Sequence, residues 1–320
     1  MSNKIKLAYF GTPIFSVELL KKIIYEGRDT FEVVCAITQP DKPVGRDQKI
    51  TACPVKLFAL ENSIAVFDEI NDDVKEALKS CDIALVFAFG HILKSDLLRA
   101  PKYGFWNVHP SALPAYRGPS PIVFPMLLGD SESAISLIQM DEKMDHGAII
   151  AQEKTDIPLD ILHNELLTKM AQMSYYILFE SVKKIATNSL VSTVQDEHKM
   201  SYTQLLSRES GYISYEILSK LLEDEILTSE EFPEIIKIFM KKNPAVSWNA
   251  PRGKMLLWNM YRSLSPWPGL WTEVVIDNVK KRLKIIEMSF NESDPLITQV
   301  QLEGKKPVSF VSFKAAYPVL

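Results

Sequence analysis

An amide, an imidazole and a carboxylate occur at spacings that suit acyl transfer to an amine. Asn107 and His109 are two residues apart on one extended segment, so their side chains point to the same side. Asp145 follows a later apolar segment. A carboxylate beside a histidine orients the ring and favours its imidazolium form, and an amide can donate to a developing oxyanion. The alternative is a hydrogen-bonded polar cluster at a sheet edge, and the spacing alone leaves both interpretations open.

Three other segments follow short apolar runs and carry residues suited to binding. Residues 11–13 either meet an anion through backbone N–H groups or form a strand-to-helix turn. They do not make a GxGxxG motif, so no dinucleotide is expected. Residues 39–56 form a polar loop that is either functional or simply solvated and mobile. Its basic residues are Lys42, Arg46, Lys49 and Lys56. Residues 87–91 either hold a flat heterocycle by their backbone or only turn the chain.

The segments that must position these residues alternate between two patterns. Apolar runs predict buried strands at 6–10, 33–37, 64–67, 83–88, 104–108, 134–140 and 148–153. Helix-type spacing predicts helices at 15–26, 54–62, 73–79 and 160–186. Strand alternating with helix predicts an α/β fold, a Rossmann-like parallel sheet with helices on both faces. Ligands of such sheets bind beyond the carboxyl ends of the strands, where the candidate residues fall.

The pattern changes after residue 190. We expect a catalytic domain over 1–189, a linker over 190–207, and a small β-barrel-like domain over 208–320. Strands are predicted at 271–276, 283–288, 297–301 and 308–313. Residues 216–249 are interpreted as a helical insertion in this second domain.

Composition bounds the class of protein. The chain has 320 residues, of which 47% are hydrophobic, and a net charge of −4, as in a globular protein with two domains. No apolar run approaches the ~18 residues that a membrane span needs, and the first apolar stretch is too short for a secretory signal. Three cysteines without a CxxC pair argue against a disulfide framework and a structural zinc site. We therefore expect a cytoplasmic protein with no metal and no membrane partner.

Positive charge is concentrated near the C-terminus. Residues 237–320 contain thirteen basic and six acidic residues, whereas 223–234 contain six acidic residues and no basic one. Such clustering is commonly a solvated surface, but it also suits the binding of RNA phosphates. Charge alone does not choose between these interpretations.

The same motifs carry a resemblance to a known family. The run Asn107-Val108-His109 with Ser111, Leu113-Pro114, Tyr116-Arg117-Gly118 and Ser120-Pro121-Ile122 resembles the signature of the 10-formyltetrahydrofolate-dependent formyltransferases. Matches at 10–13, 38–43, 45–46, 54–56, 139–141, 265–269 and 304–307 are similar to the branch that formylates initiator methionyl-tRNA. The resemblance spans nearly the whole chain.

The resemblance implies roles for individual residues. Asn107 would donate to the formyl oxygen, His109 would stabilise the oxyanion and take part in proton transfer, and Asp145 would orient His109. The co-substrate 10-formyltetrahydrofolate would contact Phe87, Ala88, Phe89, Gly90, His91, Ile92, Ser111, Ala112, Leu113 and Pro114. The acceptor end of initiator methionyl-tRNA would contact Lys42, Arg46 and Lys49. An OB-like C-terminal domain would hold the tRNA body, and we expect a monomer.

Two alternatives stay open. The acceptor would be another amine, such as an amino sugar nucleotide or glycinamide ribonucleotide, or the chain would bind folate or RNA without turnover. The glycinamide enzymes resemble only the first domain, so the motifs at 267–269 and 304–306 count against that acceptor. The complete set of Asn107, His109 and Asp145 counts against a binding module. One position differs from the family's pattern: His146 stands where a Thr frequently follows the Asp that matches Asp145.

Overall fold

The computed structural model describes residues 4–44, 47–91, 93–291 and 294–317. The chain divides into two compact units, each assembled from more than one segment. Unit 1 comprises Met1–Arg117, Ser133–Thr155 and Leu167–Met200, and unit 2 comprises Gly118–Glu132, Asp156–Leu166 and Ser201–Leu320. Among the described residues, no helix is both long and apolar enough to cross a membrane.

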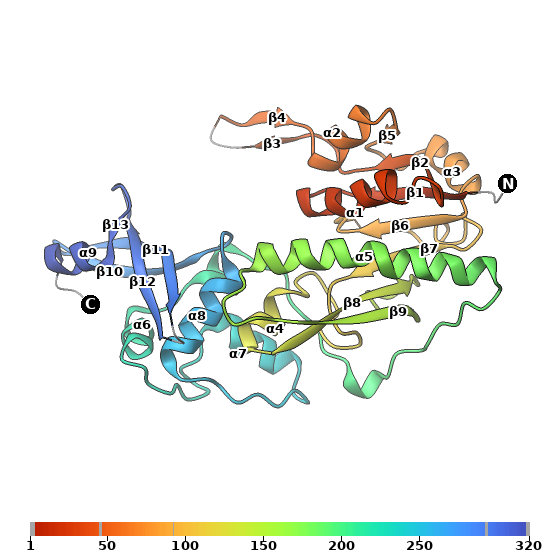
Figure 1. Cartoon of the computed structure of the whole chain (residues 1–320). Helices are drawn as coiled ribbons and strands as arrows, with labels where there is room; N and C mark the ends of the chain where they lie inside the picture. Colours follow the sequence, from red (N-terminus) through yellow and green to blue (C-terminus); the bar gives the residue numbers. More distant parts are fainter. Residues whose placement is uncertain (1–3, 45–46, 92, 292–293, 318–320) are drawn as a thin grey trace. The chain divides into compact units, whose positions relative to one another are not determined.

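A seven-stranded sheet of order β5-β2-β1-β6-β7-β8-β9 forms the centre of unit 1 (Figure 1). Its strands are β1 (Ile5–Gly11), β2 (Phe31–Ile37), β5 (Ala65–Phe67), β6 (Ile83–Phe87), β7 (Phe105–His109), β8 (Glu132–Gln139) and β9 (Ile149–Asp156). Neighbouring strands from β5 to β7 pair parallel, whereas β7 and β8 pair antiparallel. The predicted parallel sheet is confirmed for those five strands, and the sheet as a whole is mixed.

Helices cover both faces of this sheet, because successive side chains of a buried strand point to opposite sides. On one face, the Tyr9 hydroxyl of β1 donates to the Ser16 carbonyl of α1 (Ile14–Tyr25) at 2.7 Å. On the other, Phe10 packs in one apolar cluster with Leu78 of α3 (Asp72–Lys79). α3 begins where Asn71 accepts a hydrogen bond from the Val74 N–H, which satisfies one of the otherwise unpaired amides of its first turn. The remaining helices of unit 1 are α2 (Pro54–Glu61) and the long α5, whose full span is His163–Ala186.

The loop predicted at 39–56 contains a short hairpin of β3 (Lys42–Val44) and β4 (Lys49–Thr51). Lys42 and Lys49 are exposed on it, and Arg46 lies outside the described residues. Lys56, the last basic residue of this loop, is held by two carboxylates. Its ammonium pairs with Asp41 at 2.8 Å and Asp68 at 2.9 Å, and these hydrogen bonds raise the pKa of Lys56.

Unit 2 contains a four-stranded antiparallel sheet of order β10-β11-β12-β13. Its strands are β10 (Leu270–Ile276), β11 (Val279–Asn291), β12 (Asp294–Leu302) and β13 (Val308–Ser309). The strand predicted at 308–313 is wrong beyond Ser309, because Phe310 begins helix α9 (Phe310–Ala316). Ser309 caps that helix by accepting from the Ser312 N–H at 3.1 Å. The strands predicted at 271–276, 283–288 and 297–301 are confirmed, and the closure of this sheet into an OB barrel stays a prediction.

The helices of unit 2 bury a core of their own. Besides α9, they include α4 (Val123–Leu128), α6 (Tyr215–Leu222), α7 (Glu234–Lys242) and α8 (Gly253–Leu264). Phe124 of α4 stacks on Phe239 of α7 at 4.6 Å between ring centroids, so the segment interpreted as an insertion contributes to this core. Arg262 of α8 is fully buried, which removes one of the thirteen counted basic residues from the surface. Burial lowers the pKa of Arg262 to about 10, and the side chain stays charged at neutral pH.

Candidate active site

The structure brings Asn107, His109 and Asp145 together at the carboxyl end of β7. The Asn107 Nδ2 amide donates to Asp145 Oδ1 at 3.3 Å. The Nδ1 atom of His109 lies 3.5 Å from the same oxygen. His109 is buried and Asn107 is half-buried, so this carboxylate acts where water screens charge only weakly. The expected convergence of the three side chains is therefore present in unit 1.

The second ring nitrogen of His109 faces a backbone carbonyl. Nε2 lies 3.0 Å from the Tyr116 oxygen, which can only accept a hydrogen bond. The network thus assigns the ring hydrogen to Nε2 and leaves Nδ1 facing the Asp145 carboxylate. A histidine held in this way can take a proton through Nδ1 and stabilise it beside the carboxylate.

The loop that carries Asp145 is closed tightly against the end of β8. Asp145 itself has a φ of +50°, a region that few residues other than glycine adopt. Gly147 is needed for space, since a Cβ there would lie 1.7 Å from the Gln139 carbonyl oxygen. Gln195 donates to the carbonyl oxygens of both Asp145 and Gly147 at 2.8 Å. The position of the carboxylate is fixed by backbone contacts rather than by its side chain alone.

The first segment expected to contact folate follows β6, directly beside β7 in the sheet. Phe87 and Phe89 are buried, Ala88 and Gly90 have positive φ, and His91 is exposed. Ile92, which was also expected to contact folate, lies outside the described residues.

Two side chains hold this loop by the Phe89 carbonyl. Thr12 Oγ1 donates to it at 3.1 Å and Gln39 Nε2 at 3.0 Å. Lys42 of the hairpin donates in turn to Gln39. The turn after β1 therefore has a structural contact of its own, as the simpler interpretation of residues 11–13 expected.

The second segment, Ser111, Ala112, Leu113 and Pro114, follows β7 and is held from β8. The buried Ser136 hydroxyl donates to the Ser111 carbonyl at 2.6 Å. Gln152 of β9 donates to Ser136 Oγ at 2.8 Å and to the Leu113 carbonyl at 3.0 Å. Sequence reasoning does not find Ser136 or Gln152. The available signal was a serine within the apolar run at 134–140, in register with His109 across the sheet.

A charged cluster lies next to Asp145 in the same unit. The Arg117 guanidinium is fully buried, and its Nη2 lies 2.7 Å from Glu197 Oε1. This hydrogen bond holds the pKa of Glu197 below its usual range. His146 Nδ1 contacts Asp141 Oδ2 at 2.5 Å, and its Nε2 lies 3.6 Å from Glu197 Oε1. His146 thus meets two carboxylates, one on each ring nitrogen.

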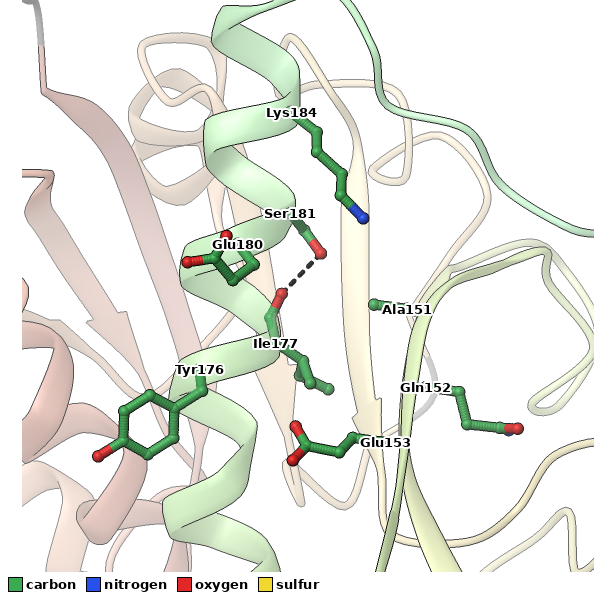
Figure 2. Close-up of a pocket in the computed structure, with 8 residues that line it drawn as sticks. All are labelled: Ala151, Gln152, Glu153, Tyr176, Ile177, Glu180, Ser181 and Lys184. Carbon is green, nitrogen blue, oxygen red and sulfur yellow. Dashed lines mark hydrogen bonds between the residues drawn. The ribbon is translucent and has the colours of Figure 1, made fainter.

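A separate pocket of about 250 Å³ lies between β9 and α5 (Figure 2). Its lining includes Glu153, Glu180 and Lys184, and the Ser181 hydroxyl there donates to the Ile177 carbonyl of its own helix at 2.6 Å. None of Asn107, His109 or Asp145 lines this pocket, so it is not the candidate site. In the part of the chain that the structure describes, no group of three or more His, Cys, Asp or Glu residues is placed to hold a metal ion.

Comparison with known proteins identifies relatives over the full length of the chain. The formyl transferase family pattern matches residues 3–182. A methionyl-tRNA formyltransferase of Hydrogenovibrio crunogenus is 30% identical over 321 residues, covering 99% of this chain and 97% of the relative. A methionyl-tRNA formyltransferase of Carboxydothermus hydrogenoformans is 29% identical, covering 98% of this chain and 96% of the relative.

Solved structures share the fold at low sequence identity. The methionyl-tRNA formyltransferase from Clostridium thermocellum has a TM-score of 0.56 and 13% identity, over 95% of this chain and 99% of that one. An N-formyltransferase from Helicobacter canadensis, in complex with folinic acid and dTDP-3-aminofucose, has a TM-score of 0.56 and 19% identity. The match covers 95% of this chain and 98% of the Helicobacter canadensis chain. Equal scores for the two structures mean that the fold does not distinguish a tRNA acceptor from a sugar acceptor.

Proposed function

Because the chain belongs to the formyl transferase family, we propose that it transfers the formyl group of 10-formyltetrahydrofolate to the α-amino group of initiator methionyl-tRNA. The observation that carries this proposal is the convergence of Asn107 and His109 on one oxygen of Asp145. An amide donor, an oriented imidazole and a carboxylate are the groups that formyl transfer to an amine requires.

The reaction forms one carbon–nitrogen bond and breaks another. The neutral amine of the aminoacyl group attacks the formyl carbon, and the carbonyl oxygen becomes an oxyanion that Asn107 Nδ2 and protonated His109 stabilise. Collapse of the tetrahedral intermediate breaks the bond between the formyl carbon and N10 of the folate. One proton leaves the attacking nitrogen and one reaches N10, and His109 Nδ1 is proposed to carry the proton between them. Asp145 stabilises the imidazolium during this exchange.

The folate is proposed to lie between the two segments that follow β6 and β7. Backbone groups of residues 87–91 and 111–114 would contact its pterin ring. The hydrogen bonds from Thr12, Gln39 and Ser136 support this placement, because they fix the two segments before any ligand arrives.

The acceptor is proposed to be tRNA rather than a sugar nucleotide. Full-length likeness to relatives named methionyl-tRNA formyltransferase supports this choice, since the shared fold does not make it. Exposed Lys42 and Lys49 on the hairpin, with Arg46, would meet the acceptor end. We further propose a monomer that acts in the cytoplasm, with a catalytic domain over 1–189 and a tRNA-binding domain over 208–320.

The test is formyl transfer from 10-formyltetrahydrofolate to charged initiator and elongator methionyl-tRNA, with the wild type beside Asn107→Ala. Formylation of the initiator, reduced by at least ~100-fold in the variant, is the expected result. Transfer only to an amino sugar nucleotide would move the acceptor to a small amine. Absence of any turnover while folate still binds would overturn the enzyme proposal.

A further inference from the structure

Gln195 lies in an extended segment that runs beside the start of β9. Thr193 and Ile149 exchange two backbone hydrogen bonds of 2.8 Å, which fixes this segment next to the loop of Asp145. Gln195 is buried, with 5% of its surface exposed. We propose that Gln195 is a positioning residue for Asp145 and that Arg117 holds it in orientation. This inference rests on the function proposed above for Asp145.

The side-chain amide of Gln195 is completely used. Its Oε1 accepts from Arg117 Nε at 3.0 Å and Nη2 at 2.8 Å. Its Nε2 donates to the carbonyl oxygens of Asp145 and Gly147 at 2.8 Å each. A flipped amide would place its NH₂ against the guanidinium donors and its oxygen against two carbonyl oxygens. Only one orientation is therefore compatible with both neighbours.

The backbone of Asp145 requires such support. A residue with a Cβ is sterically strained at positive φ, although aspartate tolerates the region better than most residues. Gln195 holds the carbonyls on both sides of His146, so it fixes the peptide planes that set the direction of the Asp145 side chain. The contacts of that carboxylate with Asn107 and His109, at 3.3 and 3.5 Å, depend on this direction.

Arg117 extends the same support to the other side of His109. It directly follows Tyr116, whose carbonyl faces His109 Nε2. The buried Arg117 side chain is fixed by Gln195 and by Glu197. The hydrogen-bonded pair of Gln195 and Arg117 therefore lies next to both residues that face the His109 ring, Asp145 at Nδ1 and Tyr116 at Nε2. A misplacement of about 1 Å in a catalytic group can reduce the rate about 100-fold, so the expected consequence is on turnover.

The test replaces Gln195 by Glu in the full chain. A carboxylate still accepts from Arg117 but cannot donate to the Asp145 and Gly147 carbonyls. We expect kcat to fall about 10- to 100-fold, while KM for the formyl donor and for the acceptor stays within about threefold. Gln195→Met also removes both donors without adding charge, so it provides the same test if the Glu variant does not fold.

A matched control is Asn62→Asp. The Asn62 amide also accepts from one side chain, Tyr25, and donates to a backbone carbonyl, that of Phe58. The change from amide to carboxylate is the same, but it lies at the end of α2, away from the residues assigned to chemistry. Its kcat is expected to stay within about twofold of the wild type.

A second measurement does not depend on substrate. The ring-nitrogen NMR signals of His109, assigned by their loss in His109→Gln, report on the group facing Nδ1. Both Gln195 variants are expected to shift the Nδ1 signal, and Asn62→Asp is expected to leave it in place. Unchanged His109 signals in both variants would overturn the positioning role even if the wild type formylates no amine. In a wild type that does formylate, an unchanged kcat would also overturn it.

Discussion

Among the residues that the structure describes, each compact unit has one fully buried arginine, and the two are bound in different ways. Arg117 in unit 1 contacts the side chains of Gln195 and Glu197, so its charge faces a carboxylate. Arg262 in unit 2 contacts the Pro158 carbonyl at 2.9 Å, the Met126 carbonyl at 3.4 Å and Asn259 Oδ1 at 2.9 Å. Its hydrogen-bond partners are all neutral. Desolvation lowers the pKa of Arg262, and the charge of Asp160 opposes this shift.

The comparison of Arg117 with Arg262 indicates that burial of a charge does not by itself mark a functional site. Arg262 joins α8 to two other segments of unit 2 through the Pro158 and Met126 carbonyls, which is a scaffold role. Arg117 acts on side chains that reach the loop of Asp145, which is the candidate site. The partners of a buried charge, more than its depth, indicate what the charge does.

The largest expected effect is at Asp145, the residue on which the unit 1 contacts converge. Asp145→Asn keeps the shape of the side chain but removes the charge that would stabilise an imidazolium. We expect kcat to fall about 100- to 10,000-fold, with a change in the free energy of unfolding within about 1 kcal/mol. Single-turnover formylation and denaturant unfolding measure the two quantities.

Asp141→Asn is the control for that prediction. Asp141 lies at the other end of the same loop and contacts His146. It is expected to keep kcat within a few-fold of the wild type. Equal losses for the two variants would mean that loop charge, and not the position of Asp145, determines the rate.

The next effect is on stability, at Arg262. Arg262→Met fills most of the volume but leaves two carbonyls and the Asn259 oxygen without this donor. We expect the free energy of unfolding to fall by about 2–4 kcal/mol, since each unsatisfied buried group costs about 1–3 kcal/mol and the lost desolvation penalty offsets part of this. Urea unfolding monitored by the fluorescence of unit 2 tryptophans measures the change.

Arg252→Met is the matched control in unit 2. Arg252 pairs with Asp224 at 2.6 Å, but its side chain is 68% exposed. The expected loss is about 1 kcal/mol or less. A loss as large as that of Arg262→Met would contradict the scaffold role of the buried arginine.

A smaller effect on turnover is expected at Arg117. Arg117→Met frees the Gln195 amide from its orientation, and we expect kcat to fall about 10- to 100-fold. Stability should fall less than in Arg262→Met, because the Glu197 carboxylate is half exposed and can regain water. The two variants are compared in parallel by kcat and by unfolding. If Arg262→Met lost more turnover per folded molecule than Arg117→Met, the assignment of Arg117 to the site and of Arg262 to the scaffold would be wrong.

The central strands of the unit 1 sheet, such as β1 and β6, were predictable because they are buried and read as continuous apolar runs. The hairpin of β3 and β4 was not, since all three residues of β4 are exposed and the segment reads as a polar loop. Helix α8 was missed for the opposite reason. Its buried positions include Asn259 and Arg262, which sequence patterns assign to solvent. These polar residues are buried because backbone carbonyls from distant segments meet them.

The candidate site shows the same limit. Asn107 and His109 were found because they are two residues apart on one strand and so point to the same side. Asp145 was found because it follows another strand. Gln195 was not found, because its partners are backbone carbonyls brought near by the pairing of Thr193 with Ile149. Such a tertiary contact has no periodic signature in the sequence.

The smallest expected effect is the pH dependence of the contact between Arg117 and Glu197. This contact lowers the pKa of Glu197 in the folded chain. Its contribution to stability is therefore complete above the usual pKa of a glutamate and is lost as the pH falls through the lower, folded value. The melting temperature of the wild type should exceed that of Glu197→Gln near pH 6, and the gap should close as the solution is acidified below pH 4. Glu61→Gln, on the exposed side of α2, should show no such convergence. A gap that stays constant with pH would mean that Glu197 does not stabilise Arg117 by its charge, and the contrast with the neutral partners of Arg262 would then be one of geometry alone.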